Sequence, residues 1–166
     1  MNIQELEQKS VQLRIDTVST IHEAQSGHTG SALSCLDILI SLYYGELNSK
    51  SVLNFDSSKP GWDKQDYLFL SKGDAVPALY AILADLGFFD KSELNSYRQI
   101  GNLLQGYATR RVPGVVYTAG PVADAFAIAA GTAVALKMEK AKNRVFTVLA
   151  DSELQDGSIW EAAMSA

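Results

Sequence analysis

Apolar residues recur at helical spacing along most of the chain, with charged or polar residues between them. Leu6, Leu13 and Ile21 illustrate this spacing in the first segment, where they mark one face of an amphipathic helix. Glycines interrupt the pattern where a helix is expected to end, as at Gly45 and Gly87. The pattern predicts six helices, which cover residues 3–24, 35–44, 75–86, 90–101, 124–140 and the stretch from 158 onward. Ser34 and Asp37 are expected to start the second of these helices, and Asp124 is expected to cap the fifth.

Two short runs of apolar residues predict strands that are buried on both faces. The runs are Tyr67–Leu70 and Val145–Leu149, and each is followed by a loop and then a helix. Strand–loop–helix units in this order are typical of an α/β fold with a parallel sheet. Because two strands make only part of a sheet, we expect a helix-rich α/β fold whose parallel sheet is incomplete unless more chain or another subunit extends it.

The last residues predict a helix that has only begun. Ser158 and Glu161 have the spacing of a capping box, and good helix formers follow them up to Ala166. Helices below about 12–15 residues are marginal by themselves. We therefore expect residues 1–166 to form part of a domain whose C-terminal part is absent. The alternative is a short terminal helix docked on a complete core.

Composition and charge argue against several classes of protein. Hydrophobic residues make up 47% of the 166-residue chain and charged residues 20%, which is typical of a globular domain. The net charge of −5 argues against binding to nucleic acid or anionic lipid. The longest uncharged apolar stretch, 125–136, is too short to span a membrane. A single cysteine, Cys35, cannot form an internal disulfide, so we expect a cytoplasmic protein.

Three loops are the candidates for a binding site. Ligands of parallel α/β sheets bind beyond the carboxyl ends of the strands, where the loops 71–74 and 150–157 are expected. The loop 25–30 places His28 beside a glycine, where it is either a functional residue or a turn residue. Asp151 follows a predicted strand, and its carboxylate is suited either to Mg²⁺ or, like those of Glu153 and Asp156, only to the dipole of the following helix.

Four motifs in order resemble the N-terminal, thiamine-diphosphate-binding domain of transketolases, and above all the N-terminal subunit of bacterial split transketolases. They are Ser26-Gly-His-Thr-Gly30, Leu70-Ser-Lys-Gly73, Leu94 to Gly106 and Asp151 to Ala163. The resemblance implies transfer of a two-carbon ketol unit between sugar phosphates, with thiamine diphosphate and Mg²⁺ as cofactors. It also implies a homo- or hetero-oligomer, in which a pyrimidine-binding domain supplies the glutamate that activates the cofactor. In split forms this domain is a separate C-terminal transketolase subunit.

The resemblance also implies roles for individual residues. His28 matches a catalytic histidine, and Asp151 matches the first Mg²⁺ ligand. The matching cofactor-binding positions are occupied by Gly120, Val122, Ser152 and Asp74. Asp156 stands where the family has a glutamate at the subunit interface.

The chain departs from the family pattern in the same loops. Asp74 and Tyr107 stand where the family has histidines, and Ala123, Ala125 and Ser152 stand where it has glycines. A carboxylate at residue 74 repels a diphosphate that a histidine would bind. The family's further metal ligands lie beyond residue 166, so we expect this chain alone to be inactive.

Two functions therefore stay open. The first is a transketolase-type transferase that needs more chain or a partner subunit. The second is a degenerate, non-catalytic relative that serves as a structural or interaction subunit, or is a decayed fragment. The substitutions cluster in the cofactor loops while the framework segments stay similar to the family. This clustering indicates altered selection on the site or deliberate engineering of it.

Overall fold

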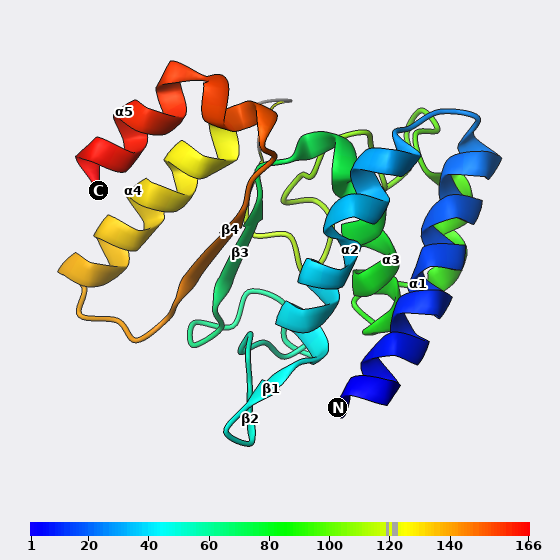
Figure 1. The fold of residues 1–166 in the computed structure, drawn as a ribbon, viewed down its shortest axis with the longest axis horizontal. Coiled ribbons are helices and arrows are strands. Elements are labelled where there is room, and N and C mark those ends of the chain that lie inside the picture. Colours follow the sequence, from blue (N-terminus) through cyan, green and yellow to red (C-terminus); the bar gives the residue numbers. More distant parts are fainter. Residues whose placement is uncertain (119, 121–122) are drawn as a thin grey trace.

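Two parallel strands stand between two groups of helices (Figure 1). The computed structural model describes residues 1–118, 120 and 123–166. The strands β3 (Tyr67–Leu70) and β4 (Val145–Val148) pair in parallel along their whole length. On one side lie α1 (Ile3–Ala24), α2 (Thr29–Tyr44) and α3 (Val76–Asp85), and on the other lie α4 (Asp124–Met138) and α5 (Gly157–Ser165). The predicted helix-rich α/β fold with a parallel sheet is confirmed.

The first two helices lie side by side, and only the start of the second differs from the prediction. α1 has its predicted bounds. α2 begins at Thr29, six residues before the predicted start at residue 35. Ser34 and Asp37 lie inside α2 rather than at its cap, and the Asp37 carboxylate accepts a hydrogen bond from Arg14 on α1. Packing of the first turn of α2 against the loop after β3 outweighs the weak helix propensity of Gly30.

Two further segments differ from the prediction in their type of structure. The predicted helix over 90–101 is instead a short 3-10 helix, Lys91–Ser96. The polar stretch after α2 contains a hairpin, in which β1 (Glu46–Leu47) pairs antiparallel with β2 (Lys50–Ser51). The two residues between these strands take positive φ values of 53° and 61°, which suit a two-residue hairpin turn. Strands this short leave no periodicity in the sequence from which to predict them.

The last helix, α5, is capped by a different residue from the one predicted. The side chain of Asp156 accepts hydrogen bonds from both the backbone N–H and the hydroxyl of Ser158. Ser158 is therefore a donor to the cap rather than the cap itself. These hydrogen bonds hold the pKa of Asp156 below its usual value, so the capping carboxylate is ionised at neutral pH.

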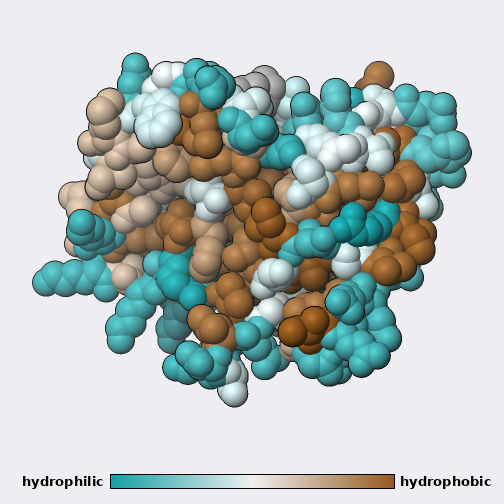
Figure 2. All heavy atoms as spheres, in the orientation of Figure 1, coloured by the Kyte–Doolittle hydropathy of each residue, from teal (hydrophilic) through white to brown (hydrophobic). Residues whose placement is uncertain are grey.

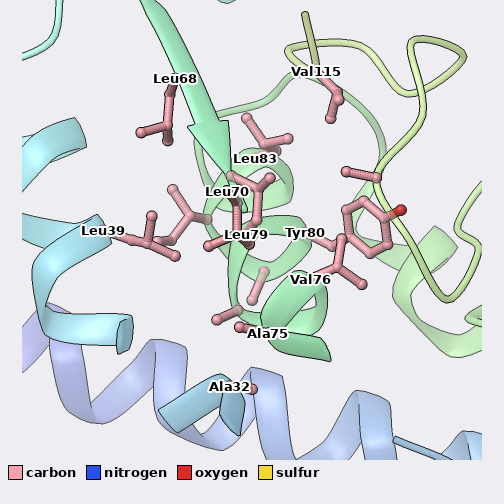
Figure 3. Packing of buried hydrophobic residues seen from close by; sticks show 14 of the residues in the cluster. Ala32, Leu39, Leu68, Leu70, Ala75, Val76, Leu79, Tyr80, Leu83 and Val115 are labelled. Carbon is pink, nitrogen blue, oxygen red and sulfur yellow. The ribbon is translucent and has the colours of Figure 1, made fainter. Parts of the chain in front are cut away.

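α3 forms the centre of the hydrophobic core (Figure 3). Its residues from Val76 to Ala84 are all buried, because the helix is apolar on every face and other elements enclose it. Leu39 of α2, Leu70 of β3 and Leu79 of α3 lie together in this core. The packing fixes the carboxyl end of β3 against α3, and with it the loop that joins them.

A tyrosine hydroxyl binds the edge of β3 that faces away from β4. The N–H of Ser71 donates to Val148 on β4, so the polar backbone groups of Leu70, one residue earlier, point to the opposite edge. There the hydroxyl of Tyr117 accepts from the Leu70 N–H at 2.9 Å and donates to the Leu70 carbonyl at 2.8 Å. Burial raises the pKa of Tyr117, so the hydroxyl keeps the proton that it donates. Tyr117 thus takes the place of a neighbouring strand at this point.

Apolar side chains also reach the surface over α4 and α5 (Figure 2). Met138, Trp160 and Met164 are among the exposed large hydrophobic residues there. α4 packs on one face of β4, α5 packs against α4, and both helices are otherwise largely uncovered. None of the helices in the described part of the chain is both long and apolar enough to cross a membrane.

Candidate functional site

The carboxyl ends of β3 and β4 place two loops at one edge of the sheet. The loop after β3 contains Asp74, within a 3-10 turn (Gly73–Ala75) that leads into α3. The loop after β4 contains Asp151 and continues as a 3-10 helix (Ser152–Gln155) toward α5. Because the strands are parallel, both loops extend beyond the same edge, which is where ligands of such sheets bind.

His28 and Asp74 lie close together although they belong to different loops. His28 immediately precedes α2, and its Nε2 atom is 3.8 Å from Oδ1 of Asp74. The two side chains are 59% and 45% exposed, so water screens their interaction. The contact is an ion pair only when the imidazole is protonated. The fold therefore places His28, the candidate catalytic residue, next to the carboxylate of Asp74, a candidate cofactor-binding residue.

A third loop reaches the same region through Arg98. Its Nη1 atom donates to the hydroxyl of Ser26 at 2.6 Å, two residues before His28. Tyr107 lies farther along this loop and is 36% exposed. The backbone carbonyl of Tyr107 accepts a hydrogen bond of 3.1 Å from the hydroxyl of Tyr80 on α3. The buried core thus holds the backbone at residue 107, the position that the resemblance matches to a histidine.

The backbone before α4 is close-packed and partly left-handed. The Gly120 N–H donates to Oδ2 of Asp124 at 3.1 Å, and a Cβ added at Gly120 would fall 2.5 Å from that atom. Asp124, predicted to cap α4, is instead the first residue of the helix. Ala123 has a φ of 62°, which costs a non-glycine residue about 1–2 kcal/mol. Ala123 thus keeps a backbone conformation that favours glycine, and Val122 lies outside the described residues.

Asp151 presents an exposed carboxylate just beyond β4. Within the described ranges, no protein donor binds this carboxylate, so its oxygens face solvent or a ligand. Nor do the described residues include a group of three His, Cys, Asp or Glu side chains that could enclose a metal ion. Ser152 is exposed and is not among the residues with positive φ, so its replacement of a glycine causes no backbone strain. Asp151 therefore offers a single free carboxylate, a hard oxygen ligand.

Glu153 is a functional candidate that the sequence pattern does not single out. Its place in an acidic loop suggested an exposed carboxylate that acts on the helix dipole, but only 3% of the residue is exposed. Three donors bind its carboxylate, from Ser71, Ala123 and Ala150. The spacing of three residues from Ala150 to Glu153 is that of a side chain that reaches back to a backbone N–H, as in a capping box, and is a signal that could have identified it.

Comparisons with known proteins converge on one family. Residues 6–166 match the family described as transketolase, thiamine diphosphate binding domain. The chain is 33% identical over 165 residues to a subunit of the apulose-4-phosphate transketolase of Phocaeicola vulgatus, and 35% identical over 163 residues to the 6-deoxy-6-sulfo-D-fructose transketolase subunit SqwG of a Clostridium species. These alignments cover 99% and 98% of this chain but 57% of each relative, so the chain spans little more than half of their length. A solved transketolase from Campylobacter jejuni matches with a TM-score of 0.90 at 30% identity, covering 100% of this chain and 26% of that one.

Proposed function

Because the chain belongs to the family of transketolase N-terminal, thiamine-diphosphate-binding domains, we propose that it takes part in the transfer of a two-carbon ketol unit between sugar phosphates. The main support is that loops from separate motifs lie near the carboxyl ends of the two strands. These loops present the side chains of His28, Asp74 and Asp151. Relatives that are named as transketolase subunits support the same type of reaction.

The residues at the carboxyl ends of the strands suit Mg²⁺, but one of them carries a negative charge that opposes the binding of a diphosphate. Asp151 offers Mg²⁺ an exposed carboxylate oxygen, whereas the space beside the Gly120 Cα is taken by the carboxylate of Asp124. The opposing charge is Asp74, whose carboxylate repels a diphosphate. Thiamine diphosphate, when bound, supplies the carbanion chemistry by which the carbon–carbon bond breaks and forms. The exposed imidazole of His28 would hydrogen-bond a sugar hydroxyl or move its proton.

A second domain completes the enzyme in this proposal. Two relatives are named as subunits, and this chain spans little more than half of their length. The missing contribution is the pyrimidine-binding domain with its activating glutamate, either on further chain or on a C-terminal transketolase subunit. The single cysteine, Cys35, is buried and unpaired, which supports a cytoplasmic location for the complex.

Titration calorimetry with thiamine diphosphate tests the proposal. With Mg²⁺ and a pyrimidine-binding partner subunit, we expect a dissociation constant below about 10 μM, which corresponds to about −7 kcal/mol. Chelation of the metal is expected to abolish this binding, because the cation links the diphosphate to the protein. Binding that is equally strong without a divalent cation would contradict the role of Asp151, and no binding under either condition would contradict the cofactor assignment.

A degenerate, non-catalytic relative is the second candidate, because two family histidines are replaced here. Asp74 turns one cofactor-binding position into a repulsive one, and Tyr107 removes the other histidine. Such a protein would serve as a structural or interaction subunit. A stable complex with the partner subunit by size-exclusion chromatography, together with no heat of thiamine diphosphate binding, would favour this candidate over the first.

Replacement of Asp74 by histidine is expected to tighten the binding of thiamine diphosphate about tenfold. The change removes a negative charge that faces the diphosphate and supplies a hydrogen-bond donor. Water around the half-exposed side chain limits the gain to about 1–2 kcal/mol. Titration calorimetry at a fixed Mg²⁺ concentration measures the effect. Asp74→Asn removes the charge alone and should give a smaller gain, whereas equal affinity of all three proteins would place residue 74 away from the diphosphate.

A further inference from the structure

Glu153 binds three segments of the chain that meet at the carboxyl edge of the sheet. Its Oε1 atom accepts from the hydroxyl of Ser71 at 2.5 Å and from the Ala123 N–H at 2.9 Å. Its Oε2 atom accepts from the Ala150 N–H at 2.7 Å. Ser71 directly follows β3, Ala123 directly precedes α4, and Ala150 belongs to the loop after β4. One buried carboxylate therefore joins the three segments.

Each of the three donors stands within three residues of a candidate ligand-binding residue, namely Asp74, Gly120 and Asp151. The carboxylate is buried, so water cannot easily replace it if it is lost. Ala123 also needs support, because its left-handed backbone persists only where surrounding contacts hold it. The hydrogen bond from its N–H to Glu153 is such a contact.

We propose that Glu153 is a positioning residue, which holds the three loops in their binding arrangement before the cofactor arrives. This inference deepens the proposed function and rests on it. A carboxylate suits the role because it only accepts hydrogen bonds, and all three neighbours donate. Loops that are arranged in advance bind more tightly, because less of the binding free energy is spent on ordering them.

Glu153→Gln removes this match while it keeps the shape of the side chain. The amide has one accepting oxygen and one donating NH₂ group, so in either orientation the NH₂ group faces a backbone N–H, that of Ala123 or that of Ala150. We expect amide hydrogen exchange at the unmatched residue to become at least about tenfold faster in the cofactor-free protein. We also expect the dissociation constant for thiamine diphosphate with Mg²⁺ to rise about tenfold.

Asp66 offers a matched control at the amino ends of the same two strands. It directly precedes β3, its side chain is 3% exposed, and it too accepts from backbone N–H groups, those of Asn54 and Arg144. Asp66→Asn removes a buried carboxylate that likewise binds several segments, and that also pairs with the Arg144 guanidinium, at the end of the strands away from the candidate site. It is expected to lower the melting temperature as Glu153→Gln does, but to leave the cofactor affinity and the exchange at residues 123 and 150 within about twofold of the original protein.

The comparison of the two variants decides the role of Glu153. Faster exchange and weaker cofactor binding in Glu153→Gln alone would establish it as a positioning residue. Equal loss of affinity in both variants, or unchanged exchange in Glu153→Gln, would overturn the role. If the original protein binds no thiamine diphosphate, the proposed function fails, whereas the exchange of the two amides still shows whether Glu153 holds the loops.

Discussion

Asp151→Ala is expected to weaken Mg²⁺-dependent binding of thiamine diphosphate by roughly 100-fold or more, because it removes the proposed ligand of the metal. The Asp151 carboxylate is exposed, and within the described part of the chain no donor competes for it. Without this carboxylate, less Mg²⁺ is bound beside the diphosphate. The repulsion between the diphosphate and the carboxylate of Asp74 is then not offset by the cation. Titration calorimetry at a saturating Mg²⁺ concentration, in the presence of the partner subunit, measures the change.

Asp90→Asn provides the control for Asp151→Ala. Asp90 directly precedes the 3-10 helix Lys91–Ser96, and its carboxylate accepts from the backbone N–H of Ser92. Asparagine retains the capping acceptor and removes one unit of charge, as Asp151→Ala does. We expect this variant to bind thiamine diphosphate within about threefold of the original protein, since Asp90 lies outside the cofactor loops. A similar loss in both variants would mean that the net charge of the protein, rather than metal ligation, controls the affinity.

Tyr117→Phe is expected to lower the free energy of unfolding by about 2–6 kcal/mol. The hydroxyl of Tyr117 satisfies both the N–H and the carbonyl of Leu70, and all three groups are buried. Phenylalanine leaves these two backbone groups unpaired at an edge where the described residues supply no neighbouring strand. Each unpaired buried group costs about 1–3 kcal/mol. Urea denaturation followed by circular dichroism measures the effect as a lower midpoint at an unchanged slope.

Tyr67→Phe, at a tyrosine within β3 itself, is the matched control. The Tyr67 hydroxyl has no hydrogen-bond partner among the described residues, and the side chain is only partly buried. We expect a change in stability within about 0.5 kcal/mol, as for a surface substitution. If Tyr117→Phe is equally mild, water or another donor satisfies Leu70, and the tyrosine is not the group that pairs the edge of β3.

Local patterns predicted the elements whose signal is complete within a short window. The bounds of α1 and of β3 agree with the prediction, because helical spacing and a continuous apolar run are local properties. The predicted caps failed where a side chain had a better partner elsewhere. Asp37 binds Arg14 on α1 instead of starting α2. Ser158 donates to Asp156 instead of capping α5. A capping side chain has several possible hydrogen-bond partners, and the spacing of residues in the sequence does not show which of them it binds.

The candidate site was predictable as a set of loops but not as a set of contacts. Motif order indicated that His28, Asp74 and Asp151 lie in loops of related function, and the parallel strands place the last two at one edge. The 3.8 Å contact between His28 and Asp74 depends on how α2 packs against the loop after β3. The glycine-like backbone at Ala123 was also hidden, because an alanine gives no sign of a positive φ.

The sequence by itself determined the α/β class, the order of the motifs and the side chains that the three loops can offer. Only the tertiary structure decided that Glu153 is buried among three segments, and that Tyr117 completes the edge of β3. The physical reason is the range of the forces involved. Periodicity and turn preferences act over a few residues, whereas burial and hydrogen bonding depend on groups that are distant in the chain and meet only after it has folded.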